Sequence, residues 1–466
     1  MPTPSRLSSV QRLPSSNADD RSLVKRVVAE MFPLMLVGAL SLALTTVDAV
    51  LLAQKYGDNV VATFGPITYL VLTFGCLING ATLAAKIQIA KLFAGRTNDA
   101  RFLSAVATSF IFVALCAVFL VVAWFAGANR LIDNMFPPES RAYAAVYLNA
   151  YFLTCFVPLA VYECAAKIFL AIKRPLLPVV CSTLACSLNI ALDWLFLFPF
   201  NLGVDGSAYA TALATCAAIA LEFAFLRSAL KTTPAQAPDD RRRRPRFDNE
   251  TARFLRKKGG VLALDNLLFY LASLYIYWEL NQFYASDAFT IGALAGISAA
   301  NHLESWVYTL QCAGQETTST AVAHYSVSSP KRVWQATVYC ALLTVALSAT
   351  LALTLYATRD WALEFFAIQK DAPAYETALV RLNYITSTYW LCGIAGVLAH
   401  ARRALGNVNL VFGVAIFSAL TRIAWTFFIV NYLENRELQH YLLAYPLSWL
   451  VAIVLLLLPP RRPNRP

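Results

Sequence analysis

Runs of about 20 or more apolar residues recur along the whole chain, and they constrain the fold more than any other feature. A helix of this length crosses a hydrocarbon core of about 30 Å. Only 14% of the 466 residues are charged and 58% are apolar, whereas soluble domains have about 25% charged residues. A transmembrane β-barrel would instead show alternating segments of about 10 residues. The sequence therefore predicts an all-α polytopic membrane protein.

Twelve of these runs are predicted to span the membrane, and the one long polar connection divides them into two sets of six. The predicted spans are 27–52, 59–85, 102–126, 143–171, 176–200, 206–229, 259–284, 289–324, 334–357, 377–400, 408–431 and 440–459. The polar connection contains the run RRRRPR, Arg241 to Arg246. We therefore expect a leader (1–26), an N-lobe (27–230), a basic linker (231–258), a C-lobe (259–459) and a tail (460–466).

Lysine and arginine are in large excess in one set of alternate loops, which includes both termini and the linker. By the positive-inside rule, both termini and the linker are expected to face the cytoplasm. The net charge of +11 lies in short loops and the linker rather than in a basic domain, so we expect no nucleic-acid partner. The linker is interpreted as a tethered hinge, with anionic lipid as an alternative partner.

The first apolar run begins at Val27 after a short polar leader and lacks a small-residue cleavage site. It is interpreted as a retained span rather than a removed signal peptide. Together with the absence of targeting signals, this favours a bacterial inner membrane protein.

The two sets of six spans resemble each other weakly when shifted by 233 residues. The stretch Leu188 to Ala191 then falls on Thr421 to Ala424, and Asp48 falls on Asn281. Because each set has an even number of spans, the two repeats must run parallel, related by an axis along the membrane normal. Two parallel lobes around a central cavity are typical of a transporter.

Acidic residues deep in a span need a function or a partner, because a charge at mid-bilayer costs roughly 2.5–3.5 kcal/mol on insertion scales. Asp48 lies well inside the first span with no basic residue within one or two helical turns. Asn189 and Asp193 are four residues apart on one face of the fifth span. Such oxygen-rich groups suit a hard cation or a shared proton. The alternative is hydrogen bonding between helices.

The second half carries an unusual number of polar residues in its predicted spans, and some of them are expected to line water or substrate. The candidates for a substrate cavity are Glu279, Asn281, Asn301, Glu304, Gln311 and Arg422. Asn281 and Arg422 stand where the first half has Asp48 and Asn189. The acidic constellation therefore belongs to the N-terminal half alone, and coupling is expected to be asymmetric between the lobes.

The sequence offers little support for catalysis. The ten cysteines lie in or beside apolar runs without a C-x-x-C pair, and the four histidines are scattered without an H-E-x-x-H motif. Neither disulfides nor a structural metal is implied. A G-x-x-x-x-G-K-[ST] loop for ATP is absent. We expect no enzymatic activity, no cofactor and no ATP requirement.

Several stretches resemble the multidrug and toxic compound extrusion (MATE) transporters. TTVDAVLLAQKYGDNVVATFG is similar to the aspartate-bearing first span and its loop, and GATLAAKIQIAKLFAGR to the end of the second span. LNIALDWLFLFPFNLGVDGSAYATALAT resembles the Asn-x-x-x-Asp fifth span, its Gly-x-x-Gly turn and the opening of the sixth span. Arg422-Ile423-Ala424-Trp425 is similar to the arginine motif of the eleventh span.

The resemblance implies two six-helix lobes forming a V, and export of substrate in exchange for inward H⁺ or Na⁺. In one branch of the family the cation site lies in the N-lobe, and its residues correspond to Asp48, Asn189, Asp193 and Thr211, with Tyr147 as the tyrosine of the fourth span. These residues would hold Na⁺ or the proton.

The sequence departs from the family pattern in two places. Another branch uses acids in spans 7 and 10, but span 10 has none here, and Asp265 and Glu279 of span 7 lie at different depths. The Gly-Asp-Thr turn after span 4 is replaced by AIKRPLLP.

The predicted function is a cation-coupled antiporter that exports amphipathic, cationic small molecules, working as a monomer in contact with membrane lipid. The alternative is a lipid-linked saccharide flippase of the same wider superfamily.

Overall fold

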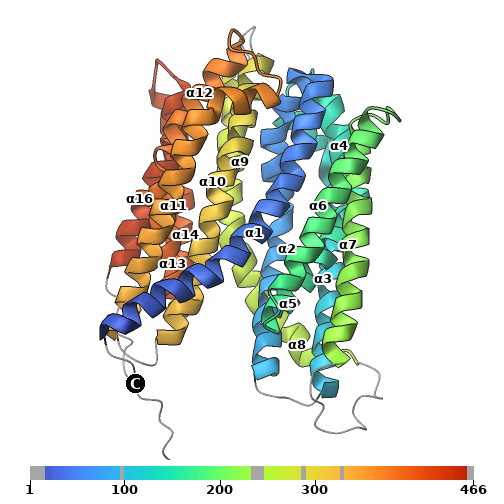
Figure 1. Cartoon of the computed structure of the whole chain (residues 1–466). Coiled ribbons are helices and arrows are strands. Elements are labelled where there is room, and N and C mark those ends of the chain that lie inside the picture. The colour runs from blue at the N-terminus through green and yellow to red at the C-terminus, as the bar shows by residue number, and fades with distance from the viewer. Residues whose placement is uncertain (1–15, 95–98, 232–245, 285–289, 326–329, 459–466) are drawn as a thin grey trace, which may run out of the picture.

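The computed structural model describes residues 16–94, 99–231, 246–284, 290–325 and 330–458, and this part of the chain is helical with short connections (Figure 1). The helices of the first half are α1 (Ser16–Tyr56), α2 (Asp58–Ala94), α3 (Asp99–Met135), α4 (Arg141–Thr154), α5 (Phe156–Ala171), α6 (Leu176–Leu197) and α7 (Asp205–Lys231). The helices of the second half are α8 (Asn249–Phe254), the π-helical turn η2 (Leu255–Gly259), α9 (Gly260–Tyr284), α10 (Thr290–Tyr325), α11 (Pro330–Phe365), α12 (Pro373–Thr386), α13 (Tyr389–Ala404), α14 (Val408–Tyr432), α15 (Leu438–Leu442) and α16 (Ala444–Leu457).

The predicted all-α polytopic fold is confirmed. Within the described residues, nine helical segments are long and apolar enough to cross a membrane, and the bent pair α4–α5 makes ten. Two further segments, α10 and the pair α12–α13, are more polar but run alongside the others (Figure 1). With them the helices correspond to the twelve predicted spans. In α10 this polarity includes Asn301, Glu304 and Gln311, which are among the residues predicted to line a cavity.

The boundaries of the predicted leader and linker differ from the structure. Helix α1 begins at Ser16, inside the predicted leader 1–26. Helix α8 begins at Asn249, inside the predicted linker 231–258, where the Asp248 carboxylate accepts a hydrogen bond from the Glu250 backbone N–H (3.1 Å). Such N-terminal caps stabilise helices by about 1 kcal/mol. The Arg-rich run from Arg241 to Arg244 and the predicted tail, 460–466, lie outside the described residues.

The fourth predicted span, 143–171, is a broken helix rather than a straight one. Helices α4 and α5 meet at Cys155 with a bend of 52°. The cause is Pro158, which has no N–H to donate to the carbonyl of Thr154 four residues earlier. The Thr154 hydroxyl also donates to the Ala150 carbonyl (2.8 Å), a side-chain contact that often accompanies helix bending. The bend places α4 against the upper part of the bundle and α5 below it (Figure 1).

The two halves contact each other near the upper end of Figure 1 through small and apolar side chains of α2 and α10. Ser298 of α10 donates a hydrogen bond to the Ala62 carbonyl (3.3 Å) and accepts one from the Gly65 N–H (3.2 Å) of α2. Lower down, α2 also crosses the start of α9, where Gly80 and Gly259 bring the two backbones together. Small residues allow membrane helices to approach this closely.

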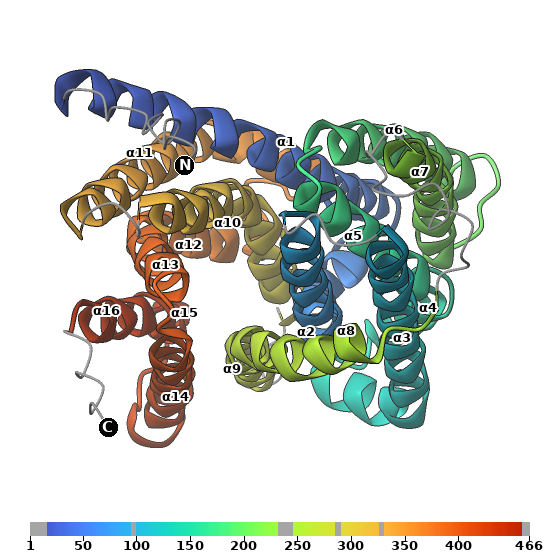
Figure 2. The same cartoon turned by 90° about the horizontal axis from the view of Figure 1, so that it is seen from below.

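Helix α1 belongs to both halves. Its lower part crosses toward α11 and α13 (Figures 1 and 2), where Val27 packs with Cys340 and Val397. Its upper part packs against α6 and α10, and Trp306 of α10 donates a hydrogen bond to the Thr46 hydroxyl (3.2 Å). The helix therefore connects the wall of the N-terminal half with α10 of the second half.

Candidate cation site and adjoining cavities

Three helices bring the predicted N-lobe residues together. Asn189 and Asp193 lie one turn apart on α6, Thr211 lies on α7, and Asp48 lies on the upper part of α1. Helices α6 and α7 form an antiparallel pair joined by a short turn in which Gly203 has φ +87°, a left-handed conformation that glycine adopts without strain. This turn allows α7 to return along α6, so that their polar faces meet beside Asp48.

Hydrogen bonds link three of the four residues in a chain. The Asn189 side-chain Nδ2 donates to Thr211 Oγ1 (3.2 Å), and Thr211 Oγ1 donates to Asp48 Oδ2 (3.1 Å). Asp193 completes the group, since its carboxyl lies beside that of Asp48 and beside the amide of Asn189. All four side chains are buried, Asn189 and Asp193 completely.

The group has more acceptor oxygens than donors. Within the described residues no hydrogen-bond donor reaches four buried oxygens: Asp48 Oδ1, Asn189 Oδ1, and Asp193 Oδ1 and Oδ2. No basic side chain of the described part forms an ion pair with either carboxylate. Two adjacent buried carboxylates cannot both be ionised without a counter-charge. The site therefore requires a proton or a bound cation.

The donor set fits both candidates. Carboxylate, amide and hydroxyl oxygens are the ligands that hard cations prefer, and four of them here lack partners. A proton shared between Asp48 and Asp193 would remove one charge. No group of three or more His, Cys, Asp or Glu side chains in the described part is arranged to hold a metal ion. The oxygens without partners suit a cation or a proton as the bound species.

Two cavities that share lining residues adjoin this group. A central cavity of about 340 Å³ lies between the two halves, and a cavity of about 470 Å³ lies within the first half. Asp48, Tyr147 and Tyr151 line both of them, and Thr211 lines the second. The rings of Tyr147 and Tyr151 are stacked with centroids 6.1 Å apart. Tyr147 therefore lines the same two cavities as Asp48, but within the described residues no hydrogen bond joins the two side chains.

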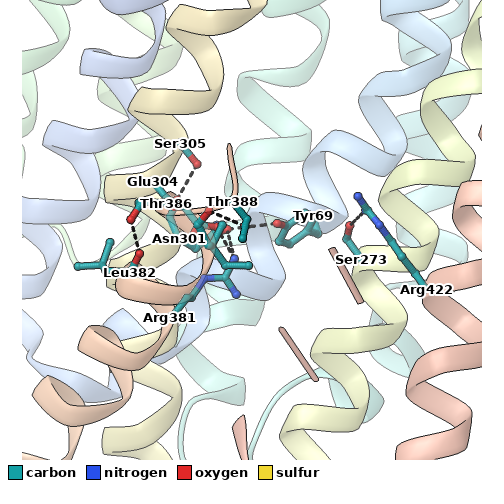
Figure 3. A network of polar contacts seen from close by, with 11 residues as sticks. Tyr69, Ser273, Asn301, Glu304, Ser305, Arg381, Leu382, Thr386, Thr388 and Arg422 are labelled. Carbon is teal, nitrogen blue, oxygen red and sulfur yellow. Dashed lines mark hydrogen bonds and ion pairs between the residues drawn. The ribbon is translucent and has the colours of Figure 1, made fainter. Parts of the chain in front are cut away.

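In the second half, a buried ion pair organises two of the predicted cavity residues. Arg381 Nη2 of α12 donates to Glu304 Oε1 (2.5 Å) and to Asn301 Oδ1 (3.0 Å) on α10, and the Tyr69 hydroxyl donates to the same Asn301 oxygen (3.2 Å). Figure 3 shows Arg381 pointing into this group from below. Asn301 and Glu304 line a small cavity of about 70 Å³. Because Arg381 neutralises Glu304, this acid is not a free carboxylate for cationic cargo.

Sequence reasoning missed Arg381. A basic residue within the tenth predicted span, 377–400, was the available signal, since an arginine is as costly in a membrane as an acid.

Arg422 of α14 is the third predicted residue that lines a cavity. Its Nε donates to Ser448 Oγ (2.9 Å) and its Nη1 to Ser273 Oγ (3.0 Å). Figure 3 shows Arg422 and Ser273 on facing helices. The cavity that Arg422 lines has a volume of about 210 Å³ and lies between α9, α13, α14 and α16.

The other three predicted residues do not line any of these four cavities. Gln311 is fully buried, and its Oε1 accepts a hydrogen bond from Ser348 of α11 (2.7 Å), so it points between α10 and α11. Glu279 lies near the end of α9 beside Tyr275. Asn281 is buried, but its Oδ1 has no partner in the described part. For these three the structure gives no support for contact with substrate.

Two other acids of the spans lie outside this group. Asp265 forms an ion pair with Arg403 of α13. Glu222 is fully buried, and neither of its carboxyl oxygens has a hydrogen-bond partner within the described part of the chain.

The helices form a two-part bundle with buried polar groups around central cavities, an arrangement typical of multi-pass membrane transporters. Comparison with known proteins specifies the class further. A family model described as MatE matches residues 33–195, a segment that includes Asp48, Asn189 and Asp193. The chain is also 22% identical over 409 residues to the probable multidrug resistance protein YoeA of Bacillus subtilis, covering 85% of this chain and 84% of that protein.

Solved structures share the fold at low sequence identity. A multidrug resistance MATE family transporter of the MOP superfamily, in an inward-facing conformation, superposes with a TM-score of 0.74 at 14% identity, covering 88% of this chain and 92% of that one. A MOP superfamily transporter from Pyrococcus furiosus, described as having a binding pocket of reverse polarity, has a TM-score of 0.71 at 16% identity and covers 95% and 97%. The resemblance to MATE transporters inferred from the sequence is confirmed by these matches.

Proposed function

We propose that the protein is a cation-coupled secondary antiporter that exports amphipathic, cationic small molecules by alternating access. The observation that carries this proposal is the buried pair of carboxyl groups, Asp48 and Asp193, with three carboxyl oxygens that lack donors. Asp48 also lines the central cavity. One group can therefore interact with the coupling ion and sense the cargo.

In the proposed mechanism, the cargo and the coupling ion compete for the negative charge of Asp48. A cationic cargo in the central cavity is attracted to an ionised Asp48, and aromatic side chains such as Tyr147, Tyr151 and Tyr270 pack against its apolar part. Loading of H⁺ or Na⁺ between Asp48 and Asp193 neutralises that charge and weakens cargo binding. Coupling of this kind requires that the two ligands favour different states.

Helix α1 is the element that can transmit the change, because it carries Asp48 and contacts both halves of the bundle. A negative potential inside the cell drives the cation inward with about 2.3 kcal/mol per charge per 100 mV. The relative named as a probable multidrug resistance protein supports export of diverse compounds. We further propose that the protein works as a monomer in a bacterial inner membrane with both termini cytoplasmic. This orientation agrees with the start of α1 and the ends of α7 and α16 lying at one end of the bundle (Figure 1).

The test is efflux of ethidium from cells that produce the intact protein, Asp48→Asn or Asp193→Asn, while H⁺ and Na⁺ gradients are collapsed separately. Both variants should lose efflux, and the gradient whose collapse stops the intact protein identifies the ion. Asp133→Asn is the matched control, because Asp133 is an exposed aspartate at the end of α3. Undiminished efflux by both variants would contradict the proposal. Absence of efflux by the intact protein across a panel of cations would favour the lipid-linked saccharide flippase.

A further inference from the structure

The cavity in the second half between α9, α13, α14 and α16, here called the C-lobe cavity, carries a positive charge that the proposed function does not use. Its acidic and basic lining residues are Asp265, Arg403 and Arg422, and His400 also lines it. Asp265 and Arg403 form an ion pair with each other. Arg422 therefore supplies the uncompensated charge.

Arg422 is 2% exposed and has no carboxylate partner among the described residues. Its guanidinium lies over the rings of Phe269 (4.2 Å) and Tyr445 (4.8 Å) and donates to two serine hydroxyls, Ser448 and Ser273. These partners are all neutral. They hold the guanidinium in place, but they do not balance its charge, and an unpaired buried charge is costly.

Two further N–H donors at the same cavity lack acceptors. The buried side chains of Gln315 and Trp449 both line the cavity, and neither Gln315 Nε2 nor Trp449 Nε1 has a hydrogen-bond partner in the described part of the chain. Each side chain is more than nine-tenths buried. The polar atoms without partners at the C-lobe cavity are thus hydrogen-bond donors. Around Asp48 and Asp193, in contrast, the polar atoms without partners are acceptors.

We propose that the C-lobe cavity binds the anionic group of a small amphipathic molecule, a carboxylate or a phosphate. Anionic oxygens would accept hydrogen bonds from Arg422, Gln315 and Trp449 and supply the missing negative charge. An Arg guanidinium is well suited to planar carboxylate and phosphate groups. The aromatic rings of Phe269, Tyr270 and Trp449 would pack against the apolar part of the ligand.

The volume and the neighbours of the cavity restrict the ligand. At about 210 Å³ the C-lobe cavity is smaller than the roughly 300–1,000 Å³ usual for drug-sized ligands. It therefore accommodates a headgroup or one or two rings. Tyr270 and Tyr308 line both this cavity and the central cavity. A ligand here would thus be one tyrosine layer away from the central cavity.

The test is equilibrium binding of 2-naphthoate to the full chain in phosphatidylcholine nanodiscs, compared with uncharged 2-naphthamide. The acid should bind at least tenfold more tightly than the amide. Arg422→Gln should weaken binding of the acid at least tenfold, and Trp449→Phe, which removes one N–H, severalfold. Trp425→Phe is the control for the tryptophan change, because Trp425 Nε1 donates to the His440 carbonyl and does not line the cavity.

A second arm distinguishes a soluble acid from a lipid headgroup. Replacement of phosphatidylcholine by phosphatidylglycerol should reduce naphthoate binding if a lipid headgroup with a net negative charge occupies the site, and should leave it unchanged if the ligand is soluble. Both results support an anion site. Equal binding of acid and amide, or unchanged binding by both Arg422→Gln and Trp449→Phe, would overturn it. The Asp48→Asn variant should bind naphthoate like the intact protein. A failure of the proposed cation coupling, measured by efflux, can therefore be distinguished from a failure of the anion site, measured by naphthoate binding.

Discussion

Arg381 of α12 and Glu304 of α10 form a buried ion pair at 2.5 Å, with side chains only 1% and 4% exposed. The pair joins the two helices that are too polar to be recognised as spans by hydropathy alone. Arg381 also lies 5.6 Å from the Tyr277 ring centroid. The two charges thus explain how a polar helix such as α10 can be stable inside the bundle.

Removal of one partner of this pair should destabilise the protein strongly. Arg381→Met or Glu304→Gln leaves an uncompensated buried charge, which typically costs about 3–5 kcal/mol. The double variant Arg381→Met with Glu304→Met removes both charges and should recover most of that loss. Thermal unfolding in detergent measures the effect. A double variant as unstable as the sum of the single ones would show that the charges act independently.

The sequence was sufficient to predict the helical architecture and the acids of the N-lobe group. Asp48 and Asp193 stand out because charges in apolar runs are rare, and the spacing of Asn189 and Asp193 places them on one helical face. Thr211 and Tyr147 were expected only from the family resemblance, because a hydroxyl in a span is too common to indicate a site.

The partners of the second-half residues could not be predicted, because they depend on which helices pack together. Gln311 and Asn301 both belong to α10, yet Gln311 faces Ser348 of α11 and Asn301 faces Arg381 of α12. Helical periodicity predicts on which face of a helix a residue lies, but it does not predict which other helix packs against that face. The bend at Cys155, in contrast, had a signal in Pro158.

Thr211 should be needed for affinity toward the coupling ion. Thr211→Val keeps the shape but removes the hydroxyl that donates to Asp48 and accepts from Asn189. A buried polar group left without its partner costs about 1–3 kcal/mol, so the half-saturating ion concentration should change by about tenfold or more. Thr211→Ser keeps the hydroxyl and should behave like the intact protein. The measurement is efflux rate against ion concentration, and equal curves for the Val and Ser variants would contradict a role for the hydroxyl.

Tyr147 should contribute to cargo binding through its ring. Tyr147 lines both the central cavity and the cavity within the first half, and among the described residues no hydrogen bond joins it to Asp48. Tyr147→Phe is therefore expected to retain ethidium efflux, whereas Tyr147→Ala should weaken apparent affinity severalfold, because a cation over an aromatic ring gains about 0.5–2 kcal/mol. Efflux kinetics on both variants test this. If the Phe variant is as impaired as the Ala variant, the hydroxyl and not the ring is the important group.

Gly80, where α2 crosses the start of α9, should not tolerate replacement by a larger residue. A Cβ on Gly80 would lie 2.3 Å from the Gly259 carbonyl oxygen and 2.7 Å from the Ala263 nitrogen, both backbone atoms. The helices would have to separate, and overpacking of this kind costs about 1–3 kcal/mol. Because α2 and α9 belong to different halves, Gly80→Ala should lower both the thermal unfolding temperature and the efflux rate. Gly75→Ala is the matched control on the same helix, since a Cβ there would meet no atom within 4 Å. Equal stability and efflux for the two variants would show that the close approach at Gly80 is not required.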